Sequence, residues 1–372
     1  MPSYQRMLIA TAAFGEGHNS AARSLAAEFE RRGLQVKIID PCLLAAPILM
    51  RQMGSAYRSI TTHLPKVWAG IYHSADRIDL GKRRNPILSV TERALAAEIR
   101  AFSPDAVVST FPLYPYFLPR IYQKMGRALP SFTVITDSIE INSAWLRASC
   151  DRWFVTDEYS RSVMLEKAIP EGKISVTGFP VHPSFAEIPR LDMTSAAAPF
   201  RVLYFPTSKA SSLRHHGRVI LNAAPEIQLT LILGRNVRRL YPLAKDLKNS
   251  FPGRVKIVGW TKRVPSYLSN HHLVIGKAGG ATVHEAIAAH CPMLIHHLVP
   301  GQEEGNLKLL EKIKAGALAE KPAALTQALQ EMLMDDARHW REMKLALAKH
   351  NTSNGAARTV DSILQFPFTH PS

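Results

Sequence analysis

The chain has 372 residues, about twice the length of an ordinary single domain, which predicts two domains. Hydrophobic residues make up 46% and charged residues 20%, without low-complexity tracts, and this composition excludes a disordered or fibrous protein. The formal net charge of +16 indicates an anionic partner, but no RNA-binding signature or zinc-finger spacing accompanies it, so we do not expect nucleic acid.

Strands and helices alternate through the first half of the chain. A buried strand at 6–12 leads into a periodic helical segment at 20–33, which stops at Gly33. Further strands are expected at 35–40, 106–110, 132–136, 152–155 and 174–177. This alternation predicts a parallel sheet with helices on both faces.

A break in periodicity separates the two halves. Residues 178–200 are rich in Pro, Ala and Ser, and we predict a linker at 186–199. The strand–helix cycle then restarts, with strands expected at 201–206, 227–234, 254–260, 272–280 and 292–298. The prediction is an α/β protein of two Rossmann-like domains, 1–185 and 200–350, facing a ligand-binding cleft, with a C-terminal helix at 354–366 that packs back on the first domain.

The start of the chain and its cysteines indicate a cytoplasmic protein. The sequence enters a strand at once, without a signal-peptide h-region, and it has no apolar run of about 18 residues or more that could span a bilayer. The three cysteines, Cys42, Cys150 and Cys291, lie far apart and form no CxxC pair, which is typical of reduced, buried thiols.

A glycine-containing turn, "AGG" at 278–280, stands between a strand and the helical segment "TVHEAIAAH". Glycine in such a turn lets an anion approach the backbone N–H groups that no helical carbonyl satisfies. Thr282 and Glu285 also have the T-x-x-E spacing of a capping box, which would give both a purely structural role. The turn alone does not decide between these interpretations, because it matches neither G-x-G-x-x-G nor a Walker A loop.

A second polar loop follows the next strand. "VPGQEEGN" at 299–306 supplies Gln302, Glu303 and Asn306, whose side chains can hydrogen-bond hydroxyl groups. Because the carboxyl ends of parallel strands lie at one edge of a sheet, the two loops predict one site, in which the backbone binds an anion and side chains bind hydroxyls. That combination suits a sugar nucleotide.

Three motifs of the chain resemble those of one enzyme family, in the same order. "KAGGATVHEA…P…VPGQEEGN" resembles the donor-site signature of GT-B glycosyltransferases of family 28. "FGEGHNSAARSL" is similar to the G-G-G-H-x-x-A-A-x-x-[IL] loop of the monogalactosyldiacylglycerol synthase and diacylglycerol glucosyltransferase branch, and residues 151–185 resemble its segment that crosses between domains. The resemblance covers most of residues 6–310 and implies a GT-B fold.

The resemblance implies that a UDP-sugar binds the second domain. Glu285 would bind the ribose hydroxyls. The diphosphate would be held by Gly279, Gly280, Ala281 and Thr282. The chain lacks the D-x-D motif with which other transferases hold a divalent ion, so no metal or other cofactor is expected at the diphosphate. A helix dipole and cationic side chains would stabilise the leaving group instead.

Further donor contacts are implied around this turn. Trp260 would stack on the uracil, although a core tryptophan is an equally open interpretation. Lys277 would contact a phosphate, or is a plain surface charge. Gln302 and Glu303 would bind the hexose hydroxyls, and Asn306 would support their loop.

The acceptor side is expected at the turn between the first strand and the first helix, which contains Gly15, Gly17 and His18. A histidine at a helix N-terminus feels a positive potential that favours the neutral imidazole. The resemblance implies that His18 deprotonates the acceptor hydroxyl in an inverting, single-step transfer; an orienting or phosphate-binding histidine is the alternative. Asp137, at another strand end, would orient His18 or the acceptor. Trp145 is all that remains here of the family's H-P-x-W stretch, so we expect a different acceptor pocket.

Residues 43–75 mix apolar and basic side chains, and "GKRR" follows at 81–84. From 51 to 100 the chain has nine Lys and Arg against four Asp and Glu. We expect this region to dock on the anionic inner face of the membrane, as a peripheral protein does. The basic residues concerned are Arg51, Arg58, Lys82, Arg83 and Arg84. An ordinary buried helical insertion is the alternative.

The sequence therefore predicts a UDP-hexose:diacylglycerol hexosyltransferase, which moves galactose or glucose from a UDP-sugar to diacylglycerol and makes a glycolipid. Two alternatives share the fold: an N-acetylglucosamine transferase acting on a polyprenyl-linked lipid, and a UDP-sugar 2-epimerase. A non-enzymatic, basic lipid-binding protein is a third alternative, but it leaves the two polar loops unexplained. Galactose and glucose differ at one hydroxyl, which the sequence does not distinguish.

Overall fold

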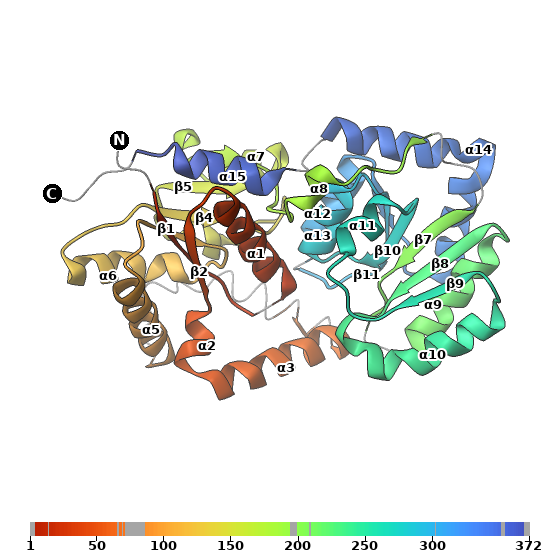
Figure 1. Ribbon diagram of the computed structural model, residues 1–372, viewed down its shortest axis with the longest axis horizontal. Helices are drawn as coiled ribbons and strands as arrows, with labels where there is room; N and C mark the ends of the chain where they lie inside the picture. The colour runs from red at the N-terminus through yellow and green to blue at the C-terminus, as the bar shows by residue number, and fades with distance from the viewer. Residues whose placement is uncertain are drawn as a thin grey trace. The chain divides into compact units, whose positions relative to one another are not determined.

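The computed structural model describes residues 4–13, 15–64, 67–68, 70, 86–193, 199–207, 210–301, 303–350 and 354–367, without the side chains of Arg58, Thr62, His63 and Ala210. Contacts divide the chain into two compact units. Unit 1 comprises Met1–Pro183, Pro300–Gly305 and Asn354–Ser372, and unit 2 comprises Ser184–Val299 and Asn306–Ser353. Each unit is built on one six-stranded parallel sheet, which confirms the predicted α/β class (Figure 1).

Sheet A, in unit 1, has the strand order β2-β1-β3-β4-β5-β6, with every neighbouring pair parallel. Its strands are β1 (Arg6–Ala10), β2 (Gln35–Ile39), β3 (Ala106–Ser109), β4 (Ser131–Val134), β5 (Arg152–Val155) and β6 (Ile174–Val176). All six coincide with strands expected from the sequence. Central strands such as β3 are buried along their whole length, which explains their continuous apolar runs.

Helices cover both faces of sheet A. On one face α1 and α15 lie side by side (Figure 1), and Phe29 of α1 and Ile363 of α15 join the core formed by Ile9 and Phe132. On the other face Leu95 and further residues of α5 pack with strand residues in a second core. The helices of unit 1 are α1 (Glu16–Arg31), α2 (Pro41–Ala45), α3 (Pro47–His63), α5 (Pro86–Phe102), α6 (Leu118–Met125), α7 (Glu158–Glu166) and α15 (Gly355–Leu364).

The first residue of α15 packs directly on the backbone of unit 1. A Cβ added at Gly355 would lie 2.2 Å from the carbonyl oxygen of Phe179, and backbone cannot rotate away as a side chain can. We therefore expect Gly355→Ala to lower the free energy of unfolding by about 1–3 kcal/mol, the usual cost of overpacking. Gly172→Ala is the matched control, because a Cβ there meets nothing within 4 Å. Urea denaturation of both variants checks this, and equal stabilities would contradict it.

Sheet B, in unit 2, has the strand order β12-β11-β10-β7-β8-β9, again all parallel. Its strands are β7 (Phe200–Tyr204), β8 (Ile227–Ile232), β9 (Val255–Val258), β10 (Leu273–Lys277), β11 (Met293–His297) and β12 (Gly316–Leu318). The first five were expected from the sequence. The edge strand β12 was not, because three residues are too few to carry a strand pattern.

Unit 2 has its own core, which includes Phe200, Leu213, Leu240 and Trp340. Trp340 is fully buried and donates its indole N–H to the carbonyl of His272 at 2.6 Å. The helices of unit 2 are α8 (Ser184–Glu187), α9 (Ala210–Ala223), α10 (Val237–Ser250), α11 (Val264–Ser269), α12 (Gly280–Ala288), α13 (Glu304–Lys312) and α14 (Pro322–His350).

Two smaller expectations concern the whole chain. All three cysteines are free and buried, which confirms the prediction of unpaired thiols. Among the described helices none combines the length and the apolar composition needed to cross a bilayer.

Candidate active site

The strand order locates the ligand-binding edge of each sheet. In sheet A, β2 and β3 flank β1, so the chain leaves β1 on one side and returns on the other; in sheet B, β8 and β10 flank β7 in the same way. A crevice forms outside the carboxyl ends of parallel strands at such a reversal, and α/β sheets bind ligands there. The loops after β1 and β3, and those after β7 and β10, are therefore the candidate binding loops.

His18 lies at the reversal in sheet A. It is the third residue of α1, rather than part of the preceding loop as expected, and Thr110, directly after β3, donates its hydroxyl to the His18 carbonyl at 3.2 Å. The imidazole packs edge-on against Phe111, with ring centroids 5.2 Å apart, and its centroid is 5.8 Å from that of Trp145. Gly15 makes this entry to α1 possible, because its φ of 99° favours glycine.

The surroundings of His18 keep its ring neutral. Burial lowers the pKa of His18 to about 4, and a hydrogen bond of the imidazole with the backbone of Thr110 opposes this effect. The predicted neutral imidazole is supported, and loss of solvation is its largest cause. Nδ1 lies 2.9 Å from Oγ1 of Thr136. When Nδ1 carries the proton, its N–H donates a hydrogen bond to that hydroxyl, and Nε2 keeps the lone pair that a general base needs.

Asp137 contacts the neighbouring tryptophan. It follows β4 and accepts a hydrogen bond from Nε1 of Trp145 at 2.7 Å. Burial raises the pKa of Asp137 to about 6, and the bond from Trp145 opposes this rise. Trp145 is 2% exposed, and its carbonyl accepts a hydrogen bond from Nε1 of Trp153 at 3.1 Å. Asp137 thus fixes the tryptophan beside His18, while the hydrogen bond that orients the His18 ring comes from Thr136 and not from Asp137.

The bond between Thr136 and His18 gives a testable role to a residue outside the predicted set. Thr136→Val keeps the shape of the side chain but removes the hydroxyl, so we expect turnover to fall by about three- to tenfold, the value of one hydrogen bond. Thr133→Val is the matched control on β4, because the Thr133 hydroxyl makes no hydrogen bond of ordinary geometry within the described residues. Initial rates and melting temperatures of both variants test this. Equal rates would show that Thr136 does not hold the ring.

On unit 2 the turn after β10 leads directly into α12. Gly279 is the N-cap, and no described side chain caps the helix, so its first N–H groups are available to an anion. The capping-box interpretation is wrong, because Thr282 is the third residue of α12 rather than its N-cap. Glu285 lies one turn further along and is half-buried. The anion-binding interpretation of Gly279, Gly280, Ala281 and Thr282 is therefore the one that the geometry supports.

The loop after β11 is tied to this turn. β10 and β11 are paired neighbours, and Nδ2 of Asn306 donates to the carbonyl of Ala278 at 3.0 Å. Asn306 is 4% exposed, and its Oδ1 has no hydrogen-bond partner within the described ranges. Glu303 is buried as well, whereas Gln302 lies outside the described residues. Asn306, the last residue of the second polar loop, thus lies beside the turn before α12 at the edge of sheet B, whereas Pro300–Gly305 belong to unit 1.

Three further predicted residues have clear positions. Trp260 follows β9 and is 57% exposed, so the alternative of a core tryptophan is wrong. Lys277 is the half-buried last residue of β10, next to the turn at Ala278. A Cβ at Gly17 would meet no atom within 4 Å, so packing does not require glycine there.

Sequence reasoning missed several residues at the strand ends. They are Thr110, Phe111 and Thr136 in unit 1 and, in the loop after β7, Phe205, Pro206 and Thr207. All lie at the ends of predicted strands or directly after them, and the strand order was the signal that could have selected them. The order of strands is a tertiary property, which the local pattern of the sequence does not give.

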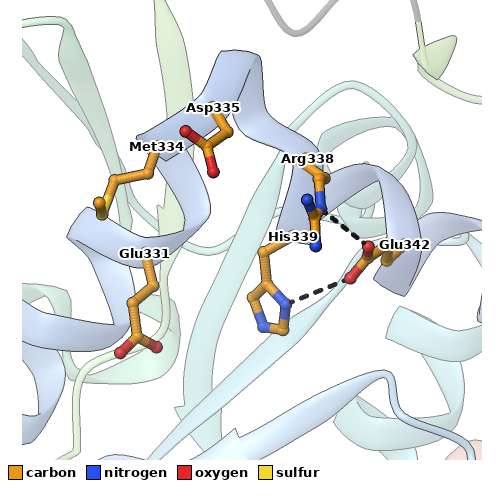
Figure 2. Close-up of a pocket in the computed structure, with 6 residues that line it drawn as sticks. All are labelled: Glu331, Met334, Asp335, Arg338, His339 and Glu342. Carbon is orange, nitrogen blue, oxygen red and sulfur yellow. Dashed lines mark hydrogen bonds and ion pairs between the residues drawn. The ribbon is translucent and has the colours of Figure 1, made fainter.

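A pocket of about 270 Å³ lies elsewhere on unit 2, at a kink in α14 (Figure 2). Figure 2 shows Arg338 and His339 directed toward Glu342, with Arg338 Nε 3.2 Å and His339 Nδ1 3.9 Å from its carboxylate oxygens. Because these charges compensate one another, we assign the pocket no part of the site.

Comparisons with known proteins agree with the motifs. The family model for monogalactosyldiacylglycerol (MGDG) synthase matches residues 18–181. A processive diacylglycerol beta-glucosyltransferase of Bacillus pumilus is 24% identical over 343 residues, which is 90% of this chain and 88% of the relative. The resemblance drawn from the motifs is confirmed.

Solved structures share the fold. The Staphylococcus aureus MnaA–UDP co-structure has a TM-score of 0.62 at 13% identity, covering 99% of both chains. The UDP-GlcNAc 2-epimerase of Neisseria meningitidis bound to UDP-GlcNAc has a TM-score of 0.59 at 15% identity, covering 97% of this chain and 100% of the other. At such identities they show the fold alone, which is the GT-B fold expected from the sequence.

Proposed function

We propose that this chain, as a family 28 glycosyltransferase related to the monogalactosyldiacylglycerol synthases and the diacylglycerol glucosyltransferases, transfers a hexose from a UDP-sugar to diacylglycerol. The observation that carries the proposal is the setting of His18. A neutral imidazole, oriented by Thr136 and enclosed by Phe111 and Trp145, stands at the strand reversal where the matched family region begins.

The reaction would be a single displacement with inversion. Nε2 of His18 takes the proton of the acceptor hydroxyl as its oxygen forms a bond to the anomeric carbon, and the bond from that carbon to the UDP phosphate oxygen breaks. The diphosphate leaves with the bonding electrons, and the N-terminus of α12 would stabilise its added charge.

We propose that this stabilisation needs no metal ion. The sequence has no D-x-D motif, and α12 together with Lys277 offers positive potential at the turn. Retention of activity after chelation with EDTA is the expected result. Loss on chelation and recovery with Mg²⁺ or Mn²⁺ would contradict it.

One assay separates this function from its rivals. Purified protein is mixed with diacylglycerol vesicles and, in turn, UDP-glucose, UDP-galactose and UDP-GlcNAc, and both glycolipid and UDP are measured. Equal amounts of glycolipid and UDP from a UDP-hexose are expected. The 2-epimerase alternative, which shares the fold, predicts conversion of UDP-GlcNAc without any lipid product. Product that forms only with a polyprenyl-linked acceptor would favour the N-acetylglucosamine transferase. Absence of any turnover would favour the non-enzymatic lipid-binding protein.

We also propose that the protein docks on the inner face of an anionic membrane. Helix α3 exposes Ile48, which is 72% exposed, and Met53, which is 44% exposed, beside the exposed Arg51. Eight of the fourteen residues of α3 whose burial is described are exposed, which supports docking over a buried insertion. Lys82, Arg83 and Arg84 lie outside the described residues. An apolar face with flanking basic residues is typical of interfacial helices.

Binding to vesicles should therefore depend on lipid charge. We expect the protein to sediment with vesicles that contain anionic lipid at low salt. Binding to neutral vesicles, or to anionic vesicles at high salt, should be weaker by about tenfold or more. Replacing the five basic residues Arg51, Arg58, Lys82, Arg83 and Arg84 by glutamine should have the same effect as salt. Unchanged sedimentation of that variant would place the docking surface elsewhere.

A further inference from the structure

A pocket of about 210 Å³ in unit 1 is lined by none of the residues described above as catalytic. It lies between the loop after β1, which contributes Ala13, and the two helices that follow β2. Leu43 of α2 and Met50 and Gly54 of α3 supply apolar walls, and Asp40 and Arg51 supply the charged groups. Its lining thus comes from the same strand-end edge of sheet A as His18.

The two charged groups of the pocket differ in what they offer a ligand. Asp40 accepts hydrogen bonds from the N–H of Ala13 and the N–H of Leu43, both at 2.9 Å, and from the hydroxyl of Tyr114 at 3.4 Å. It is therefore occupied in holding α2 and the β1 loop together. Arg51 is exposed, and no described residue forms a hydrogen bond or ion pair with it. The pocket consequently presents apolar surface and one free set of N–H donors.

Two packed aromatic rings, those of Tyr114 and Phe111, lie between Asp40 of the pocket and His18. Tyr114, whose hydroxyl bonds Asp40 and the carbonyl of Thr11, has its ring centroid 5.7 Å from that of Phe111. Phe111 in turn packs against His18 at 5.2 Å. The Asp40 wall of the pocket is thus linked to the proposed base through the packed rings of Tyr114 and Phe111.

The volume limits what the pocket can hold. Sites for whole small ligands usually measure about 300–1,000 Å³, so 210 Å³ accommodates only one end of a lipid. The rest of the molecule needs apolar surface outside the pocket. Leu44 of α2 is 53% exposed, and Ile48 and Met53 of α3 are 72% and 44% exposed, which provides that surface at the pocket's own helices.

We propose that this pocket binds the glyceryl ester end of the acceptor lipid, with Arg51 donating hydrogen bonds to an ester carbonyl and the free hydroxyl directed toward His18. Leu43 and Met50 contact the glycerol carbons and the first methylenes, and the acyl chains leave over α3. This inference rests on the proposed transfer to diacylglycerol and names the residues that hold its acceptor.

The first experiment fills the pocket. Met50→Trp places a larger side chain in it, whereas Ser55→Trp places a tryptophan further along α3, at an exposed residue that does not line the pocket. With monomeric dihexanoylglycerol as acceptor, and no vesicles, we expect the KM for the acceptor to rise about tenfold or more for Met50→Trp and to stay within about twofold for Ser55→Trp. The dissociation constant for UDP should stay unchanged in both.

A second experiment tests the proposed hydrogen bond from Arg51 to the ester carbonyl. Because Arg51 is exposed, its replacement should not unfold the protein. Arg51→Gln should raise the KM for dihexanoylglycerol by about three- to tenfold, but not the KM for the matching diether, which has no carbonyl. Equal KM values for Met50→Trp and Ser55→Trp, or an equal effect of Arg51→Gln on ester and ether, would overturn the pocket assignment. Absence of glycolipid from the unaltered protein with any acceptor would instead overturn the proposed function itself.

Discussion

Replacing His18 by alanine is expected to reduce turnover by about 10²–10⁴-fold while leaving the affinity for UDP within about twofold. The reason is the position of His18 in unit 1, where Thr136, Phe111 and Trp145 surround its ring. As a general base it contacts only the acceptor hydroxyl, whereas UDP is expected at the turn before α12. The measurements are the dissociation constant for UDP and the single-turnover rate at saturating acceptor.

A control and a contrary outcome sharpen this test. His339→Ala removes an exposed histidine paired with Glu342 on α14 and should change neither quantity. A large loss of UDP affinity in His18→Ala, with little further loss of rate at saturation, would mean that His18 binds donor phosphate. Asp137 would then become the candidate base.

The pH dependence of kcat/KM distinguishes the same two residues, because a general base acts in its unprotonated form and this ratio reports the free enzyme. Burial sets the pKa of His18 at about 4 and that of Asp137 at about 6. If His18 is the base, kcat/KM stays level as the pH falls from 7 to 5 and decreases only when the pH passes through about 4. If Asp137 is the base, kcat/KM already decreases when the pH passes through about 6.

The strands of both sheets were predictable because each is a local run of apolar residues bounded by polar turns. β12 escaped prediction because Gly316–Leu318 is defined by its pairing with β11, in which Met293 lies opposite Gly316, and not by its own composition. The start of α1 was predicted four residues too late, since "GEGHN" is polar and only the φ of Gly15 reveals the turn. Local pattern thus gives the elements, and tertiary pairing sets their ends.

The candidate site was only partly predictable for a related reason. His18 and the Gly279 turn carry motifs, which a sequence displays directly. Thr136 and Phe111 carry none, and they matter because the order of strands in sheet A brings β3 and β4 beside the start of α1. The capping box at Thr282 failed for the opposite reason: its spacing was correct, but α12 starts before it.

Replacing Glu285 by alanine is expected to weaken UDP binding by about 1–3 kcal/mol, because a charge-assisted hydrogen bond to the ribose is lost. The structure removes the capping role that could otherwise explain an effect, since Gly279 and not Thr282 is the N-cap of α12. Loss of a helix cap therefore cannot explain a lower affinity for UDP. Calorimetric titration with UDP is the measurement, and Glu311→Ala, an exposed glutamate on α13, is the matched control.

A ligand lacking the ribose hydroxyls identifies the bond that Glu285 makes. The original protein should bind 2′,3′-dideoxy-UDP about as weakly as the Glu285→Ala variant binds UDP, because either change removes one partner of the same contact. The variant itself should bind UDP and the dideoxy analogue almost equally, since two changes to one interaction are not additive. Full additivity of the two losses would show that Glu285 acts elsewhere. A lower melting temperature with unchanged UDP affinity would give Glu285 a structural role only, and the ribose would then need another partner on unit 2.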